Sequence, residues 1–597
     1  MSPSEPRSTV SRRSALIASS GLALTALAAS PAEATGRPER GAKVPTPSVT
    51  GPVPSRGGRD HPFLATDVDL AGRGYALEEF FYSGKANSYD IPIPTVLNDP
   101  PLPTVGKAVS SHPYTTRLVV HRPTDPARFS GTVFVEWTNT TPDYEFPIWW
   151  LQNHEFMLRE GHGYVGVAAN HWAVHAPQDG LKVWNPERYA ALDFPLVLLS
   201  DPEPDPWRHD DQLSYDVFAQ GMKAVRAVPR IMGGLPVRHV IAGGHSRSAV
   251  HLGVYLNAVH PHAPVADGVM PIIAGRQVRS DLDIPVLKVL SETDFVAMYD
   301  EWTQLTARQP DTDRFRTWWM SGTTHVDHHM ALARAATQVR DLPDRPLEGT
   351  DCDPPGLSRV QSQHVVSAAM AAMVRWVTGG KPPAHSPLPE FTATPPALVR
   401  DEHDNARGGI RLATFAVPVA TDRGTTTCDN NLVGTHVPFD DATLRKLYPS
   451  HEDYVGAVTA ALFRNVRDGF LLHEDATDLA TQARASIVGK GLVTGPLVGN
   501  VADFRRALSI PILRDHTQTY HFRDGERLLG LLDQAVTAAA EGYTTARRKP
   551  FDRAIGLVRQ YRDLVAAMPD RSRTIADLLV RFAGTLIDEL TAERDRH

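Results

Sequence analysis

A serine in a sharp turn is the residue with the clearest capacity for chemistry. The segment 240–249 reads Val-Ile-Ala-Gly-Gly-His-Ser-Arg-Ser-Ala, an apolar run that enters a tight turn and continues into a helical pattern. A nucleophilic serine on such a strained turn needs small residues two positions before and after it, because strand and helix crowd together there. Gly244 and Ser248 meet that need, although glycine is usual at the second position. Ser246 is therefore predicted to be a nucleophile; an ordinary strand–turn–helix with an inert serine is the alternative.

A carboxylate is expected after a later strand, because this chemistry requires the chain order serine, acid, histidine. An apolar run over 285–290 is followed at once by Glu292 and Asp294. Asp294 is preferred, since a short turn beyond the strand brings its carboxylate over the site, and Glu292 is the alternative acid. A helix N-cap or an exposed loop charge is the structural alternative for either residue.

A histidine base is expected in the loop after the last strand. The apolar run 315–320 is followed by Ser-Gly-Thr-Thr-His, which makes His325 the predicted base, with His328 and His329 as rivals. The three histidines and Asp327 also resemble a set of metal ligands. No cluster elsewhere in the sequence supports such a site, so no metal is expected.

Together the three residues predict acyl transfer through a covalent intermediate. His325 would take the proton from Ser246, and the serine oxygen would attack an acyl carbon. The acid would orient the imidazole and stabilise its charged form. This chemistry needs no cofactor.

The oxyanion formed in such a reaction needs backbone N–H donors. One is predicted to be the N–H of Arg247, directly after the nucleophile. The second is expected from the loop after the apolar run 132–137, that is from Thr138, Asn139 or Thr140. An ordinary turn is the alternative for this loop, and an ion pair is the alternative for the Arg247 side chain.

The elements that must position these residues alternate between strand and helix. Helical spacing is indicated over 215–225, before the run that leads to Ser246, and over 248–259, after it. Strands that alternate with helices predict right-handed βαβ units and a mostly parallel sheet, hence an α/β fold. The buried strands are indicated by short apolar runs at 118–121, 132–137, 164–169, 237–242, 268–272, 285–290 and 315–320.

Three further regions surround this predicted core over 61–345. An insertion at 172–210 contains Trp172, Trp184, Tyr189, Trp207 and many prolines. It is either a lid or pocket wall, or a surface loop whose aromatic side chains pack on the domain. Residues 346–490 form an extension, with a helix at 365–377 followed by short strands and a helical stretch. Residues 500–597 are predicted to be a separate, small all-α region with segments near 525–541, 550–568 and 573–593.

The N-terminus has the features of an export signal. The paired arginines at 11–14 precede an uncharged run at 15–29 and a small-residue cleavage site at 32–34. This order resembles a bacterial twin-arginine signal over 1–34 and predicts a secreted or extracytoplasmic protein with no membrane anchor after cleavage. An uncleaved N-terminal anchor is the alternative. Residues 35–60, rich in Pro, Gly, Ser and Arg, are predicted to be a flexible leader.

Composition narrows the class of protein further. The chain has 597 residues, with 42% hydrophobic and 22% charged, which is typical of a soluble globular protein of several domains. A net charge of −7 without a basic cluster gives no indication of a nucleic-acid partner. Oligomeric state is not indicated. Cys352 and Cys428 are the two cysteines, and both a disulfide and two free thiols are compatible with an exported protein.

Several motifs together resemble a bacterial α/β-hydrolase domain family, whose large members mostly have unassigned substrates. The motifs that carry the resemblance lie at 134–139, 214–216, 244–248, 291–294 and 322–325, and continue at 400–402, 408–412, 438–439 and 447–451. The resemblance covers about 60 to 485, which places the extension with the catalytic domain. It implies serine-hydrolase chemistry on small-molecule or polymeric esters, supports Ser246 and His325, and leaves Glu292 and Asp294 as alternatives.

Two residues depart from that family's pattern. Ser248 replaces glycine in the turn, and Arg247 stands where glutamine is expected. Both bear on substrate preference more than on activity. The tail from about 500 resembles the small helical FIMAH modules of secreted bacterial proteins, which implies an accessory role. The sequence thus favours a secreted carboxylic-ester hydrolase, with an acyltransferase or a catalytically silent binding protein as alternatives.

Overall fold

A computed structural model of the chain describes most of the region from residue 40 onward. The described residues are 40–56, 59–91, 106–197, 211–274, 277–296, 304, 308–345, 357–393, 396–426, 432–486, 488, 525–545, 547–567 and parts of 580–595. The predicted signal segment, Trp207 and both cysteines lie outside these residues. Export and a disulfide therefore stay predictions.

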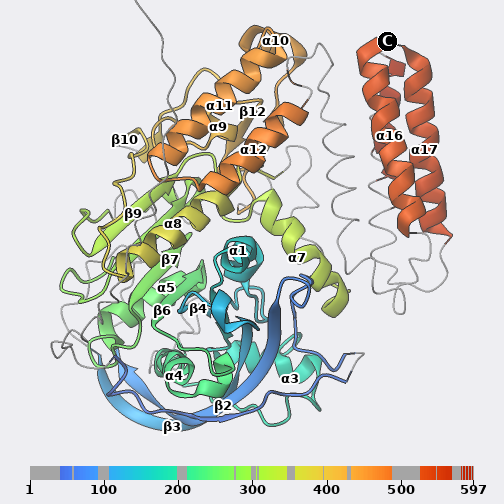
Figure 1. Ribbon diagram of the computed structural model, residues 1–597. Helices are drawn as coiled ribbons and strands as arrows, with labels where there is room; N and C mark the ends of the chain where they lie inside the picture. Colours follow the sequence, from blue (N-terminus) through green and yellow to red (C-terminus); the bar gives the residue numbers. More distant parts are fainter. Residues whose placement is uncertain are drawn as a thin grey trace, which may run out of the picture. The chain divides into compact units, whose positions relative to one another are not determined.

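A nine-stranded sheet forms the centre of the molecule (Figure 1), in the order β1-β2-β3-β5-β4-β6-β7-β8-β9. All pairs from β5 to β9 are parallel, whereas β1, β2 and β3 join the sheet in antiparallel fashion. This is the mostly parallel sheet of an α/β-hydrolase fold, as predicted. The strands are β1 (Ser48–Thr50), β2 (Tyr75–Asp90), β3 (Lys107–Pro123), β4 (Thr132–Trp137), β5 (Gly163–Val167), β6 (His239–His245), β7 (Gly268–Ile272), β8 (Val286–Ser291) and β9 (Phe315–Met320).

Helices cover both faces of this sheet. Because β4 is fully buried, its alternating side chains enter two different cores, with Val133 in one and Phe134 in the other. The first core is closed by α4 and α5, the second by α1 and α8. The helices and single turns up to residue 377 are η1 (Pro126–Arg128), α1 (Ile148–Arg159), α2 (His171–His175), α3 (Leu181–Trp184), α4 (Ser214–Ala227), η2 (Pro229–Met232), α5 (Arg247–Val254), the π-turn η3 (Tyr255–Val259), α6 (Glu292–Val296), α7 (His328–Asp341) and α8 (Ser362–Val377).

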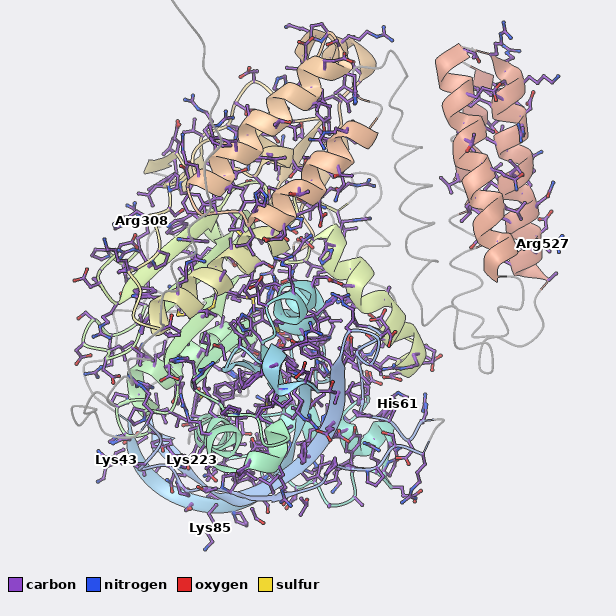
Figure 2. All side chains as sticks on the ribbon, viewed as in Figure 1. Lys43, His61, Lys85, Lys223, Arg308 and Arg527 are labelled. Carbon is purple, nitrogen blue, oxygen red and sulfur yellow. The ribbon has the colours of Figure 1, made fainter. Side chains whose placement is uncertain are left out.

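Each of the seven predicted apolar runs lies in or overlaps a strand, and the predicted helices α4, α5 and α8 are present. The flexible leader predicted over 35–60 is wrong from residue 48, because β1 pairs along β2 there. Side chains such as Lys85 on β2 project outward from this part of the sheet (Figure 2).

The predicted insertion begins with α2 and α3 and packs tightly on the sheet. Tyr189 is fully buried, and its hydroxyl accepts a hydrogen bond from Arg117 on β3 at 2.8 Å. Arg117 also forms buried ion pairs with Glu79 at 2.7 Å and Glu145 at 2.8 Å. The aromatic side chains Trp184 and Tyr189 thus pack on the domain, as one of the two interpretations predicts.

The extension after residue 345 packs against the second core. Ile410 bridges to Met320 at the end of β9, and residues of α11 and α12 join the apolar cluster of α1 and α8. Its remaining elements are β10 (Phe391–Ala393), β11 (Pro396–Leu398), α9 (Ala413–Ala416), β12 (Ala420–Arg423), β13 (Thr435–Pro438), α10 (Asp441–Leu447), α11 (His451–Arg467) and α12 (His473–Ala485).

The C-terminal helices have an apolar core of their own. Helix α16 (Gly525–Thr545) contacts α17 (Arg548–Ala566), and residues between 583 and 590 complete the cluster. This agrees with the predicted helical region, although 500–524 lie outside the described residues. Within the described ranges, no helix is both long enough and apolar enough to cross a bilayer.

Candidate active site

Ser246 lies in a strained turn between β6 and α5. Its backbone has φ 59° and ψ −123°, a conformation that non-glycine residues rarely adopt. A Cβ on Gly244 would come within 2.7 Å of the Ser248 Cβ, which explains why small residues are required on both sides of the serine. The turn has the geometry predicted for a nucleophile elbow, and serine at position 248 fits it.

The predicted base reaches the serine directly. His325 lies in the loop after β9, and its Nε2 is 2.7 Å from the Ser246 Oγ. The two side chains come from residues 79 positions apart in the chain. A hydrogen bond of this length allows proton transfer between them.

The carboxylate of Asp294 lies on the other side of the histidine ring. Its Oδ1 is 3.8 Å from the His325 Nδ1, an ion-pair distance rather than a direct hydrogen bond. Contacts of this kind are commonly long before substrate binds. Its Oδ2 accepts hydrogen bonds from the Ser291 backbone N–H at 2.9 Å and the Ser291 hydroxyl at 2.8 Å, which fix the orientation of the carboxylate.

The alternative acid, Glu292, points elsewhere. Its Oε2 accepts the backbone N–H of Gly322 at 2.7 Å, and its Oε1 accepts Arg400 at 3.0 Å and the N–H of Gly424 at 3.1 Å. The carboxylate is fully buried and every contact is with a group other than the histidine ring. The geometry therefore favours Asp294 as the partner of His325.

Two buried side chains shape the electrostatics around these residues. Burial lowers the pKa of Lys288 to about 8, while attraction to the Asp294 carboxylate raises it. The pKa of His245, next to the nucleophile, is held well below its usual value by burial, so this ring is neutral. The His245 Nε2 is 3.3 Å from the backbone carbonyl of His325, which links the nucleophile turn to the loop of the base.

The rival histidines belong to a helix. Asp327 caps α7 by accepting the N–H of Met330 at 2.8 Å, and it also accepts the Ser362 hydroxyl. His328 and His329 form the first turn of this helix, and burial lowers the pKa of His329 to about 4. Asp327 is thus engaged as the cap of α7.

The loop after β4 differs from the prediction for the oxyanion donors. The backbone N–H of Thr138 donates to the Val167 carbonyl at 3.3 Å, and that of Asn139 donates to the Phe146 carbonyl at 3.0 Å. Both predicted donors are therefore already used within the fold. Thr140, the third residue considered, is buried in the same loop.

Two roles in this loop were not predicted. The Asn139 side-chain amide donates to the carbonyl of His245 at 2.9 Å and so ties the loop to the nucleophile turn. Glu136, at the end of β4, accepts the N–H groups of Trp149 at 2.9 Å and Trp150 at 3.2 Å, and thereby caps α1. The family motif at 134–139 contains both residues, but sequence spacing alone gives no sign of these partners.

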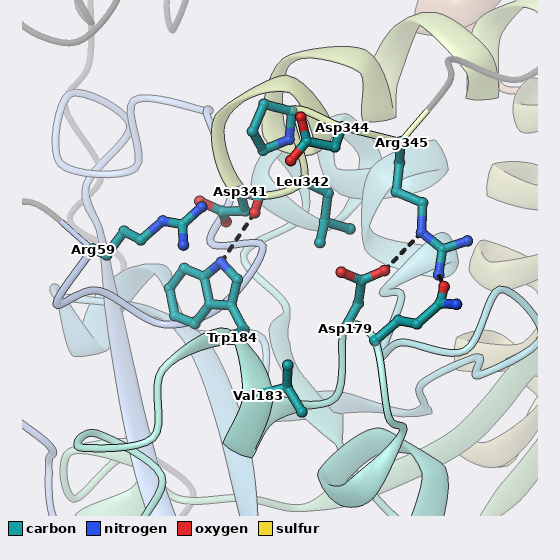
Figure 3. Close-up of a pocket in the computed structure, with 10 residues that line it drawn as sticks. Arg59, Asp179, Val183, Trp184, Asp341, Leu342, Asp344 and Arg345 are labelled. Carbon is teal, nitrogen blue, oxygen red and sulfur yellow. Dashed lines mark hydrogen bonds and ion pairs between the residues drawn. The ribbon is translucent and has the colours of Figure 1, made fainter. Parts of the chain in front are cut away.

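A pocket of about 460 Å³ lies between the insertion and the end of α7 (Figure 3). The Trp184 indole N–H donates to the Asp341 carbonyl at 3.1 Å on one side, and Asp179 pairs with Arg345 at 2.6 Å on the other. None of the three residues of the serine, histidine and acid set lines it. The insertion therefore also lines this pocket, which does not include Ser246.

The fold and the site together define the class of protein. A mostly parallel sheet that brings a serine, a carboxylate and a histidine to the carboxyl ends of three strands, in that chain order, is an α/β hydrolase. The chain belongs to the alpha/beta hydrolase domain family, whose model matches residues 49–481, more than half of its length. This match includes the insertion and most of the extension, and ends before the C-terminal helices.

Solved structures resemble this chain at low sequence identity and over less than half of its length. An α/β serine hydrolase without a lid from Xanthomonas campestris is 16% identical over 42% of this chain and 99% of its own, with a TM-score of 0.23. A glucuronoyl esterase from Solibacter usitatus is 12% identical over 41% and 76%, with a TM-score of 0.22. Est1E from Butyrivibrio proteoclasticus is 11% identical over 37% and 92%, with a TM-score of 0.21. No curated protein matches the sequence.

Proposed function

We propose that the protein is an exported serine hydrolase that cleaves carboxylic esters through an acyl-enzyme on Ser246. The observation that carries this proposal is the 2.7 Å contact between the Ser246 Oγ and the His325 Nε2, on a strained turn at the end of a parallel strand. Membership of the hydrolase family supports the reaction class.

The reaction runs in two halves. His325 accepts the Ser246 proton as the serine oxygen bonds to the acyl carbon, and the charged imidazole then gives that proton to the departing alcohol. Water enters, loses a proton to His325, and attacks the acyl-enzyme; the proton returns to Ser246 as the carboxylic acid leaves. Asp294 stabilises the imidazolium in both halves.

For the oxyanion we propose the backbone N–H groups of Arg247 and Thr140. Arg247 directly follows the nucleophile, and Thr140 remains from the loop after β4, since Thr138 and Asn139 donate within the fold. Loss of one such donor typically lowers kcat by about 10²–10³.

Labelling with a fluorophosphonate probe tests the proposal. We expect the full chain to be labelled at Ser246, the Ser246→Ala variant to lose the label, and the exposed-serine control Ser280→Ala to keep it. Peptide mapping identifies the modified residue. A wild-type protein that stays unlabelled while folded would favour the catalytically silent binding protein.

An ester panel then separates hydrolysis from acyl transfer. Esters that vary in acyl length and in alcohol are incubated with wild type and Ser246→Ala, with and without added acceptor alcohols. We expect free acid as the main product under both conditions. A new ester that dominates when an alcohol is present would assign the alternative, an acyltransferase.

Export is a separate part of the proposal. Replacing both arginines of the twin-arginine pair, Arg12→Lys and Arg13→Lys, should leave the protein in the cytoplasm of a bacterial host that has this pathway. The measurement is the distribution of the protein between cell fractions. Unchanged export would contradict the twin-arginine signal and would not bear on the roles of Ser246, Asp294 and His325.

A further inference from the structure

The loop that carries the catalytic base is held from outside the core domain. We define the base loop as residues 321–326. Its Ser321 N–H donates to the Ile410 carbonyl at 3.0 Å, and its Val326 N–H donates to the Leu432 carbonyl at 2.9 Å. The Gly322 carbonyl accepts the Ser358 hydroxyl at 2.8 Å. Both ends and the tip of the loop are thus hydrogen-bonded to the extension.

Glu292 lies between the base loop and the extension and contacts both. One carboxylate oxygen accepts the Gly322 N–H, and the other accepts Arg400 and the Gly424 N–H. Gly322 has φ +78°, so the loop turns sharply at the residue that the carboxylate holds. A buried carboxylate with charge-assisted bonds on both oxygens fixes its surroundings more firmly than neutral bonds would.

The neighbouring residue makes a second bridge. The Thr293 hydroxyl accepts the backbone N–H of His325 at 3.1 Å and donates to the Gly424 carbonyl at 2.7 Å. The base is therefore positioned through its own backbone by a residue that the extension also holds. Glu292 and Thr293 separate the acid from the end of β8, so the same short turn serves the acid and the base.

We propose that the Glu292–Arg400 ion pair is a positioning pair that holds the base loop in its catalytic geometry, which makes the extension part of the catalytic apparatus. The inference deepens the proposed function and rests on it. Arg400 contributes charge to the buried carboxylate without touching Ser246 or His325. Without Arg400, the Glu292 carboxylate keeps the N–H donors of Gly322 and Gly424 and the electrostatic attraction of Arg423. It then loses its direct charged hydrogen bond, and the Gly322 turn is the group that its movement affects most directly.

Hydrogen exchange tests the role of the Glu292–Arg400 positioning pair without any substrate. In the full chain, Arg400→Met should raise the exchange rate of the peptide that contains 321–326 about tenfold or more, because its protected amides donate to Glu292, Thr293 and the extension. Arg400→Lys, which keeps the charge but not the planar guanidinium, should give an intermediate rate. The matched control is Arg407→Met, which removes an exposed ion pair to Glu390 within the same extension and should leave this peptide at the wild-type rate.

Labelling kinetics test the consequence for Ser246. We expect Arg400→Met to lower the maximal rate of reaction with the fluorophosphonate probe about 10- to 100-fold while the half-saturating probe concentration is unchanged, since a small displacement of the base affects the reaction and not the binding. Thermal unfolding verifies that each variant is folded. If Arg400→Met does not fold, Arg400→Lys still tests the proposal.

The outcomes separate the two proposals. If the base loop exchanges faster in Arg400→Met but the wild type is not labelled, the Glu292–Arg400 pair does position the loop and the proposed function is wrong. If the wild type is labelled but Arg400→Met behaves like Arg407→Met in both exchange and labelling, the positioning role of the Glu292–Arg400 pair is wrong. The proposed hydrolase function then still stands. A parallel loss of rate and of binding would also count against the positioning role, because that pattern indicates general disorder of the site.

Discussion

Three consecutive residues, from the last position of β8 onward, support the proposed acid and base in different ways. Ser291 orients the carboxylate of Asp294, Glu292 braces the turn at Gly322, and Thr293 holds the backbone of His325. The choice between two neighbouring carboxylates is thus made by their partners and not by their spacing from the strand.

Substituting the two carboxylates one at a time distinguishes the proposed acid, Asp294, from the supporting residue, Glu292. Asp294→Asn should lower kcat by about 10⁴, because an asparagine cannot stabilise the imidazolium and favours the wrong tautomer. Glu292→Gln, the matched change two positions earlier, should cost far less, about 10- to 100-fold. Turnover of the preferred ester is the measurement. A larger loss in Glu292→Gln would reassign the acid.

The sequence predicts the proposed catalytic residues better than it predicts the residues that hold them in position. Each proposed catalytic residue follows an apolar strand, in the required chain order, so the sequence alone can predict all three: Ser246, Asp294 and His325. The supporting partners Arg400 and Gly424 lie more than a hundred positions from Glu292. No local pattern predicts such contacts. The N–H groups of Thr138 and Asn139 are occupied by the nearer carbonyls of Val167 and Phe146, and the residue types in this loop do not show that pairing.

The nucleophile turn depends on the absence of a side chain at Gly244. Gly244→Ala should lower the free energy of unfolding by about 1–3 kcal/mol, because the new methyl group collides with Ser248. Gly456→Ala, on the exposed face of α11 with open space around it, should instead raise it by about 0.5–1 kcal/mol. Urea unfolding of both variants measures the difference. Equal effects would show that the turn is not crowded.

The start of α1 is sensitive to pH through a residue on β4. Burial raises the pKa of Glu136 to about 8, from 4.5. The folded state therefore keeps a proton that the unfolded chain releases, and the stability gained is present below pH 4.5 and lost as the pH rises towards 8. Over that window the free energy of unfolding should fall by up to about 1.4 kcal/mol per pH unit.

Glu136→Gln removes this titration and keeps an acceptor for the helix. Unfolding in urea at several pH values between 5 and 8 should give a flatter dependence for the variant than for wild type. Because all other groups are shared, the difference between the two curves isolates Glu136. Parallel curves would mean that the carboxyl is ionised in the folded protein throughout.

The elements that sequence analysis missed have physical reasons in common. Strand β2 is sixteen residues long, but its polar positions, such as Glu78 and Lys85, hide it from a search for apolar runs. Helix α1 is buried on most sides, so its apolar residues follow no clear helical period, and Pro147 gives no capping side chain. Its cap comes from Glu136, which lies on another element.

At the level of the whole molecule, the C-terminal helices are separate from the catalytic apparatus. Their apolar cluster contains only residues after 525, and the family match ends at residue 481. Deletion of 500–597 should therefore leave kcat and KM for small esters within about twofold of wild type, as expected for a part with an apolar core of its own. Circular dichroism verifies folding of the shortened chain. A collapse of turnover in a folded protein would contradict the accessory role.

The base loop has a consequence for how the protein is made. A ribosome produces Ser246, Asp294 and His325 well before Gly424, whose carbonyl accepts the Thr293 hydroxyl, and Leu432, whose carbonyl accepts the Val326 N–H of the base loop. A nascent chain therefore contains every reacting residue for some time without the frame that aligns them. Stalled chains of increasing length, treated with the fluorophosphonate probe, should react only after residue 432 has left the exit tunnel.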